Sequence, residues 1–553
     1  MIRVGEIRLP LDHADGAVRA AVLERLGLAD GEVVALRVHK RGHDARKRGS
    51  VLLVYTVDVA VQGDERAVLA RVAGRPHVGP TPDATYRHAA VAPAGFGSAT
   101  EGERPVVVGF GPCGLFAALV LAEAGFRPIV LERGKPARER TEDTWGLWRR
   151  GRLDPDSNVQ FGEGGAGTFS DGKLWTQIGD PRHLTRKVID AFLAAGAPDD
   201  IAWQARPHIG TFRLVRVVEA MRETIVRLGG EVRFRHRLVD LHAEDGRLAA
   251  IDVERPDGTR ETMPVRRLVL APGHSARDTF ALLHARRVAL QAKPFSIGFR
   301  IEHPQGVIDR ARFGPAAGHP ALGAADYKLV HHASNGRSVY SFCMCPGGTV
   351  VAATSEEGRV VTNGMSQYSR NERNANAGIV VGLTPEDVAQ PDRHGDGGVL
   401  DGIAFQRFWE RRAFELGGGG YAAPGQRVAD FLAGRASTAF ERVLPSYRPA
   451  VTPTDLSTAL PADAIDAIRE ALPAFARKIA GFAMDDAVLT AVETRTSSPV
   501  RVLRDAQTRE SPSLRGLYPA GEGCGFAGGI MSAAVDGIET AERVATSIAA
   551  EAS

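Results

Sequence analysis

Residues 105–114 read Pro-Val-Val-Val-Gly-Phe-Gly-Pro-Cys-Gly, an apolar run that enters a glycine-rich turn. The turn fits the pattern G-x-G-x-x-G, and the apolar residues 115–124 that follow it predict a helix. A second short strand is predicted at 128–131 and ends at Glu132, close to the spacing of about 20 residues at which an acid follows this pattern. A strand, a glycine-rich turn, a helix, a strand and an acid in this order predict a Rossmann-like unit that binds a dinucleotide.

Each residue type in this unit has a physical role. The first glycine permits the tight turn, the second lets a pyrophosphate approach the backbone, and the third lets the helix pack on the strand. Free N–H groups at the helix N-terminus favour the anion, and the acid accepts hydrogen bonds from a ribose. The residues of this unit predicted to contact the cofactor are Gly109, Gly111, Pro112, Cys113, Gly114, Glu132 and Arg133.

Two further loops carry many glycines. Residues 161–173 (Phe-Gly-Glu-Gly-Gly-Ala-Gly-Thr-Phe-Ser-Asp-Gly-Lys) cannot form an ordinary helix, because each helical glycine costs about 1 kcal/mol. Residues 521–530 (Gly-Glu-Gly-Cys-Gly-Phe-Ala-Gly-Gly-Ile) precede a predicted helix. Backbone N–H groups in such loops suit a diphosphate or the edge of a flavin ring. From these loops and two strand ends, the predicted cofactor contacts are Gly164, Gly165, Gly167, Thr168, Ser170, Lys173, Leu238, Ala271, Gly273, His274, Gly521, Glu522, Gly529 and Ile530.

The composition agrees with one large cofactor in an ordinary globular protein. Gly accounts for 62 of 553 residues, above the usual ~7%, and much of this excess falls in the three loops. A net charge of +3 argues against nucleic-acid binding on charge alone, and there is no apolar run of about 18 residues to span a membrane. With four cysteines and no visible signal segment, we expect a cytoplasmic protein, and we predict no metal site.

These patterns predict an α/β protein. A Rossmann-like FAD-binding domain is expected in two discontinuous segments, with an inserted mixed β/α substrate domain between them and a small α+β domain at the N-terminus. The expected boundaries are 1–75 for the small domain, 76–103 for a linker, 104–281 and 486–553 for the FAD-binding domain, and 282–485 for the substrate domain. The basic segment 40–48 is interpreted as a solvated loop. One continuous strand is predicted at 231–241.

Several longer motifs occur between residues 270 and 530. They are LAPGHSARD (270–278), PFSIGFRIEH (294–303), FCMCPGG (342–348), VTNGMS (361–366) and GLYPAGEGCGFAGGI (516–530). With these motifs the chain resembles the bacterial family of FAD-dependent dehydrogenases, which are NAD(P)/FAD-dependent oxidoreductases of the two-dinucleotide-binding-domain type. The resemblance covers nearly the whole chain and implies FAD and an oxidoreductase fold, but it does not imply a substrate.

The predicted reaction is two-electron hydride transfer between flavin N5 and a small organic substrate. Residues 190–300 contain no second strand-linked G-x-G-x-x-G, which argues against a permanent nicotinamide domain and leaves room for a transient NAD(P)H site. Cys343 and Cys345 would share one face of a strand, as a redox pair or, more commonly, as small packing residues. The candidate catalytic residues are Lys173, Arg300, His303, Tyr340 and Cys345.

The sequence is also compatible with other functions. A flavin monooxygenase has the same layout of loops. An FAD-dependent RNA-modifying or RNA-binding protein would dock RNA through the N-terminal domain, although no RNA-binding aromatic signature lies beside residues 40–48. A non-catalytic FAD-binding scaffold is a third alternative, and the sequence does not set the oligomeric state.

Overall fold

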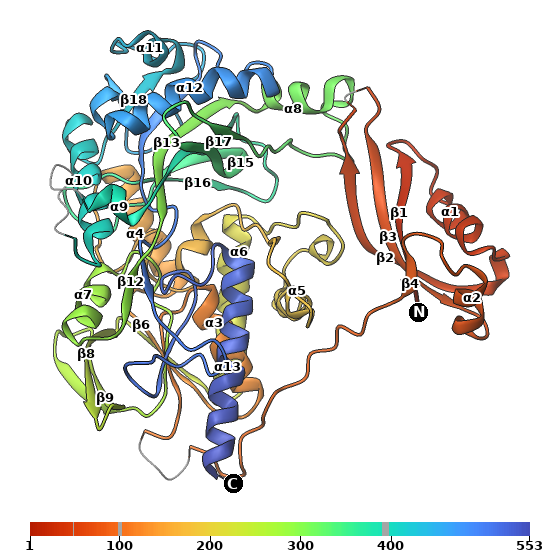
Figure 1. Cartoon of the computed structure of the whole chain (residues 1–553), viewed down its shortest axis with the longest axis horizontal. Coiled ribbons are helices and arrows are strands. Elements are labelled where there is room, and N and C mark those ends of the chain that lie inside the picture. Colours follow the sequence, from red (N-terminus) through yellow and green to blue (C-terminus); the bar gives the residue numbers. More distant parts are fainter. Residues whose placement is uncertain (48, 98–101, 390–396, 553) are drawn as a thin grey trace.

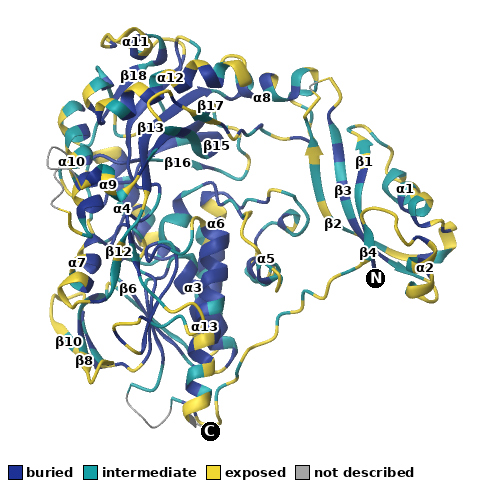
Figure 2. Ribbon diagram, viewed as in Figure 1, coloured by how far each residue is buried: buried dark blue, intermediate teal, exposed yellow. Residues whose placement is uncertain are grey.

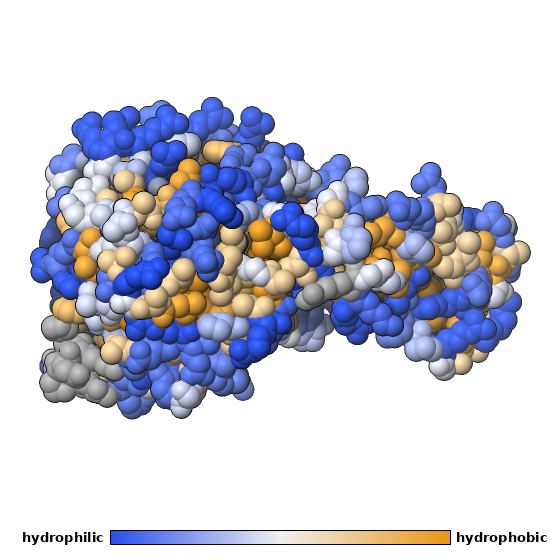
Figure 3. Space-filling view, turned by 90° about the horizontal axis from the view of Figure 1, so that it is seen from above, coloured by the Kyte–Doolittle hydropathy of each residue, from blue (hydrophilic) through white to orange (hydrophobic). Residues whose placement is uncertain are grey.

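A computed structural model describes residues 1–47, 49–97, 102–389 and 397–552 (Figure 1). A small N-terminal domain stands to one side of a larger body, and the segment after it runs back along the body. Seen from above, the small domain is a lobe joined to the body through a narrower region (Figure 3). Within the described ranges, no helix combines the length and the apolar character that a membrane crossing requires.

The centre of the body is a parallel sheet built from distant parts of the chain. Its strand order is β22-β11-β5-β6-β7, and every neighbouring pair is parallel. Because both faces are covered, the inner strands are wholly apolar, as Val106–Val108 shows. Helices α3 and α13 pack along each other on one face and are largely buried (Figure 2). The bounds are β5 (Val106–Val108), α3 (Pro112–Glu123), β6 (Ile129–Glu132), α5 (Leu184–Ala194), α6 (Thr211–Arg227), β7 (Glu231–Phe234), β11 (Leu268–Leu270), β22 (Leu517–Pro519) and α13 (Ile530–Ala552).

The single strand predicted at 231–241 is wrong. β7 ends at Phe234, and Arg235 adopts a left-handed backbone conformation with φ of 58° that turns the chain out of the parallel sheet. The next strand, β8 (Arg237–Glu244), belongs to a separate antiparallel sheet with β9 (Arg247–Glu254) and β10 (Arg260–Pro264). Apolar residues recur on both sides of the break, at Val232, Phe234, Leu238 and Leu241, so the sequence pattern does not reveal it.

The inserted domain is a mixed, mainly antiparallel sheet of order β14-β15-β17-β13-β20-β18-β19, with β16 paired to β15. Strand β20 lies beyond the expected boundary at 485 and still pairs with β13. Helix α12 packs its apolar side on this sheet. The bounds are β13 (Phe295–Pro304), β14 (Val330–His332), β15 (Ser338–Ala352), β16 (Thr362–Ser366), β17 (Asn374–Leu383), β18 (Ala423–Arg427), β19 (Val451–Pro453), α12 (Ala462–Lys478) and β20 (Val488–Glu493).

The remaining elements connect and cover these sheets. They are α4 (Ala137–Arg150), α7 (Arg277–Ala285), β12 (Leu290–Ala292), α8 (Gln305–Phe313), α9 (Pro385–Val388), α10 (Asp401–Leu416), α11 (Val428–Ala433) and β21 (Val500–Val502).

The N-terminal domain has the order β-α-β-β-α-β, and its sheet runs β2-β3-β1-β4. This is the split βαβ arrangement of ferredoxin-like domains. Residues 40–44 extend strand β2, so interpreting them as a solvated loop was wrong; Arg48 lies outside the described residues. Strand β4 falls inside the segment expected to be a linker. The bounds are β1 (Ile2–Pro10), α1 (Ala17–Leu26), β2 (Val33–Asp44), β3 (Leu52–Val61), α2 (Glu65–Arg71) and β4 (Val78–Pro80).

Strand β2 also docks the small domain on the body. The backbone N–H of Arg41 donates to the carbonyl of Trp203 at 2.6 Å, and the N–H of Ala205 donates to the carbonyl of Arg41 at 2.9 Å. The Arg41 guanidinium lies 4.4 Å from the centre of the Trp203 ring. The two domains therefore share backbone hydrogen bonds as well as the segment that links them in sequence.

Candidate cofactor and substrate site

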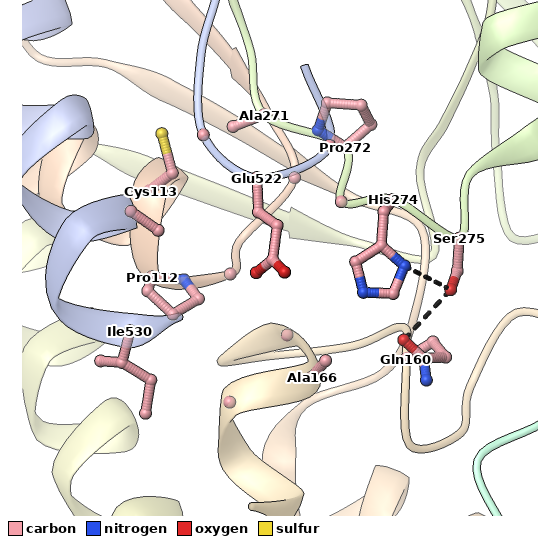
Figure 4. Close-up of a pocket in the computed structure, with 18 of the residues that line it drawn as sticks. Pro112, Cys113, Gln160, Ala166, Ala271, Pro272, His274, Ser275, Glu522 and Ile530 are labelled. Atoms are coloured by element: carbon pink, nitrogen blue, oxygen red, sulfur yellow. Dashed lines mark hydrogen bonds between the residues drawn. The ribbon is translucent and has the colours of Figure 1, made fainter. Parts of the chain in front are cut away.

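The three glycine-rich loops meet at one cavity, at the carboxyl ends of β5, β6 and β11 (Figure 4). This is the edge of an open parallel sheet at which ligands bind. The first turns of α3 and α13 both reach the cavity, which the inserted domain closes from the other side. The predicted cofactor contacts that line it are Gly109, Gly111, Pro112, Cys113, Glu132, Arg133, Gly165, Gly167, Ser170, Lys173, Leu238, Ala271, Gly273, His274, Gly521, Glu522, Gly529 and Ile530.

Three predicted contacts do not line the cavity: Gly114, Gly164 and Thr168. A Cβ atom at Gly114 would lie 1.9 Å from the carbonyl oxygen of Gly109, so this glycine serves helix–strand packing. Gly164 donates its N–H to the carbonyl of Phe110 at 2.9 Å and joins the second loop to the first. The Thr168 hydroxyl donates to the carbonyl of Glu163 at 3.2 Å. All three residues therefore support the conformation of the glycine-rich loops without lining the cavity.

Glu132 ties the first two loops together. Its buried carboxylate accepts three backbone hydrogen bonds, from Phe110 at 2.8 Å, Gly134 at 2.8 Å and Gly162 at 2.9 Å. A carboxylate offers about four acceptor positions, so these bonds leave room for one more. Glu132 also lines the cavity, and the predicted ribose contact therefore stays a prediction.

Arg140 fixes the second loop from below, and sequence reasoning missed it. Its fully buried guanidinium donates to the carbonyls of Asn158 at 2.7 Å, Val159 at 2.8 Å and Glu163 at 2.7 Å. Burial lowers the pKa of Arg140 to about 10, so the group remains charged at neutral pH. Its partners are backbone carbonyls, which leave no signal in the sequence.

His274 borders the cavity beside a chain of polar groups. The Ser275 hydroxyl donates to Gln160 Oε1 at 3.1 Å (Figure 4). Arg495 Nη1 donates to the same hydroxyl at 3.0 Å. Burial, together with the charges of Arg495 and Arg277, lowers the pKa of His274 to about 3. The imidazole is therefore neutral at pH 7 and offers the cavity one donor or one acceptor.

A buried charge cluster stands behind this group. Glu410, which is fully buried, accepts from Arg277 at 2.6 and 2.9 Å and from Arg495 at 2.9 and 3.0 Å. Arg495 also donates to the Ser355 hydroxyl at 2.7 Å and lines the cavity. Sequence reasoning missed the cluster, because its members come from three distant segments.

Among the catalytic candidates, Lys173 lines the cavity and Arg300, His303, Tyr340 and Cys345 do not. Arg300 is buried and donates to both carboxylate oxygens of Glu493 at 2.7 Å. His303 Nε2 is 2.5 Å from the carbonyl oxygen of Phe482, and the Tyr340 hydroxyl bonds to Ser296. The inserted domain presents Cys343, a member of the suggested redox pair, together with Asn363. The lining residues of this domain that sequence reasoning did not select are Phe342, Val361, Thr362, Glu493, Arg495 and Thr496.

A bulge in β15 breaks the alternation on which the prediction of a shared cysteine face depended. Phe342 stands opposite Gly378 and Cys345 opposite Asn376, so two residues, 343 and 344, face one residue of β17. Cys343 has a left-handed backbone with φ of 42° and lines the cavity. Cys345 is fully buried beneath it.

The cavity fits a dinucleotide such as FAD. Two helix N-termini and the backbone of three glycine-rich loops surround it, which suits a pyrophosphate. Gly165 comes so close to the first loop that an added Cβ would lie 2.7 Å from the Cα of Gly111. The Nε of Arg237, a lining residue, is buried without a hydrogen-bond partner among the described residues, which suits a polar ligand in the cavity.

Comparisons with known proteins give two family matches and one relative that covers nearly the whole chain. Residues 294–496 match the family described as "FAD-dependent protein, C-terminal domain-like", and residues 1–60 match a domain of unknown function, DUF8436. An uncharacterized protein of Clostridium beijerinckii is 45% identical over 545 residues, which cover 98% of each chain.

Similar solved structures include the flavin-dependent brominase Bmp2, with a TM-score of 0.37 and 11% identity over 81% of this chain and 79% of that one. A flavoprotein/dehydrogenase from Cytophaga hutchinsonii has a TM-score of 0.36 and 11% identity over 80% of this chain and 78% of that one.

Proposed function

The chain belongs to one family with the uncharacterized protein of Clostridium beijerinckii, and its residues 294–496 match an FAD-dependent family; on this premise we propose that it binds FAD and works as an oxidoreductase. The observation that carries the proposal is the convergence of the three glycine-rich loops on one cavity. Residues 109, 165 and 521 are far apart in sequence, and folding brings them to the same edge of the parallel sheet.

The chain's own residues would bind and orient the cofactor. The first turn of α3 would hold the pyrophosphate, Glu132 a ribose, and Gly521 with Glu522 the ribityl chain. When bound, FAD supplies two-electron chemistry at its isoalloxazine ring. Lys173 places a cation at the cavity, and the sheet of the inserted domain excludes water from its other side.

We propose a dehydrogenase or reductase that exchanges a hydride with a small organic substrate, and NAD(P)H as a transient electron donor. The described residues form one all-parallel sheet, and the cavity occupies its carboxyl edge, so a nicotinamide would have to enter the same cavity and leave again. Anaerobic mixing with NADH, NADPH and a panel of metabolites tests this. Loss of the flavin absorbance when a donor is added under anaerobic conditions supports a dehydrogenase. A C4a-hydroperoxide spectrum seen on adding oxygen would instead identify a monooxygenase.

Binding of FAD is tested with Gly111→Val. An added Cβ at Gly111 meets only an ordinary contact, 3.6 Å from the Cα of Gly165, so the fold should tolerate the larger side chain. The side chain would occupy the space a pyrophosphate needs. We expect the wild type to purify yellow and the variant to lose most of its flavin absorbance at an unchanged far-UV spectrum.

Gly179→Val is the matched control, because Gly179 has open space around it, ordinary backbone angles and no place in the cavity. This control should keep its flavin. A colourless wild-type protein that takes up no added FAD would refute the proposal.

A further inference from the structure

Two cysteines of β15 stand where the inserted domain meets the cavity. Cys343 lines the cavity, and Cys345 lies beneath it with its thiol 3.4 Å from the carbonyl oxygen of Cys343. The bulge holds both residues in place, since the Arg300 guanidinium donates to the Cys343 carbonyl at 2.8 Å and the Lys173 ammonium donates to the carbonyl of Met344. A left-handed backbone at a non-glycine residue is uncommon and concentrates at functional sites.

We propose that Cys343 and Cys345 form a redox-active dithiol–disulfide pair, which makes thiols and disulfides the substrate class of this site. The inference rests on the proposed FAD oxidoreductase function. Cys343 faces the cavity and meets the substrate sulfur, and Cys345 is the resolving thiol. Lys173 and Arg300 are positioning residues that hold the bulge and place positive charge beside it.

The charges around Cys343 favour its thiolate form. A hydrogen bond from Cys345 lowers the pKa of Cys343 well below its ordinary value, and Lys173 and Arg300 lower it further, against the opposite effects of burial and of Asp171. Glu522 and Glu493 also interact with Cys343, and negative charge on Cys343 adds to the burial that raises the pKa of Glu522. A thiolate is the form of cysteine that attacks a disulfide.

The electron balance closes with one external acceptor. When the pair oxidises, each thiol loses one proton and one electron, an S–S bond forms, and a bound FAD would accept the two electrons and two protons. Two substrate thiols then reduce the new disulfide by exchange, through a mixed disulfide with Cys343, and leave joined as one disulfide. Dioxygen or another two-electron acceptor would reoxidise the FAD. Stabilising the thiolate stabilises the reduced pair, which makes its disulfide the stronger oxidant of substrate thiols.

Anaerobic reductive titration of the holoprotein with dithionite, after mild oxidation, tests the pair. We expect the wild type to take up about four electrons per flavin, two for the flavin and two for the disulfide. Cys343→Ser and Cys345→Ser should each take up about two. Cys524→Ala is the matched control, because Cys524 is buried outside the cavity, and it should behave as the wild type. Uptake of two electrons by the wild type, with all four thiols free, would overturn the proposal.

A second measurement needs no flavin. At pH 6 an ordinary thiol is less than about 1% thiolate, so Cys343 should react with iodoacetamide roughly tenfold faster than such a thiol, and Lys173→Gln should slow it. Peptide mapping identifies the labelled site, and the buried Cys113, Cys345 and Cys524 are internal references. Equal rates of alkylation at all four cysteines would overturn the proposal even if FAD binds. A colourless protein in which Cys343 is alkylated rapidly would refute only the FAD assignment.

Discussion

Replacing Glu410 by glutamine should destabilise the protein more than any exposed charge change. The Glu410 carboxylate is fully buried and shares four hydrogen bonds with two buried guanidinium groups, those of Arg277 and Arg495. Glutamine keeps the shape and removes the charge, so two buried cations lose their common anion. Removing one partner of a buried ion pair costs about 3–5 kcal/mol.

The lower end of that range applies here. Glu356 remains 2.8 Å from Arg277, whereas Arg495 keeps the hydroxyls of Ser275 and Ser355. We expect a loss of about 3 kcal/mol, which lowers Tm by roughly 5–10 °C for domains of this size. Because Arg495 lines the cavity, the variant should also release flavin at a lower temperature than the wild type.

Differential scanning calorimetry with flavin fluorescence measures both effects in one experiment. Glu415→Gln is the matched control, since Glu415 lies on the same helix, is 57% exposed and stands 3.9 Å from Arg412. Its effect should stay within about 0.5 kcal/mol. A Tm loss below about 2 °C for Glu410→Gln would show that the cluster does not depend on this charge.

Two further predictions concern the acids that line the cavity. Glu132→Gln leaves one acceptor oxygen for three backbone N–H groups. We therefore expect the affinity for flavin, measured by equilibrium dialysis, to fall roughly 10- to 100-fold. An unchanged affinity would contradict the role of Glu132 in joining the loops. The second prediction concerns the effect of pH on Glu522. Burial raises the pKa of Glu522 from 4.5 to about 7. Between these two pH values the folded protein keeps a proton on Glu522 that the unfolded chain has lost. The contribution of Glu522 to stability therefore falls as pH rises from about 4.5 to 7, by on the order of 1–2 kcal/mol after allowance for its partial exposure. Denaturant titrations of flavin-free protein at several pH values should show this slope in the wild type and a flatter curve in Glu522→Gln; parallel curves would refute the assignment.

Local patterns were enough to predict the parts of the site that are continuous in sequence. The turn at 109–114 has its strand, helix and following acid within one short segment, and the structure places that acid beside the turn. The loops at 161–173 and 521–530 showed themselves by glycine content, because bare backbone near an anion requires it. The α/β class followed from these segments, and the family resemblance from further continuous motifs between residues 270 and 530.

The tertiary structure alone decided which distant residues complete the site. Glu410 meets Arg277 and Arg495 because three elements pack together, and many acids and arginines in this chain are equally good partners by type. The bulge that brings Cys343 to the cavity depends on its register with β17, and the break after Phe234 on a single left-handed residue. Hydrophobic periodicity and glycine content are local properties that a sequence displays directly. Ion-pair partners, strand register and the aim of a side chain into a cavity are set by packing between segments far apart in the chain.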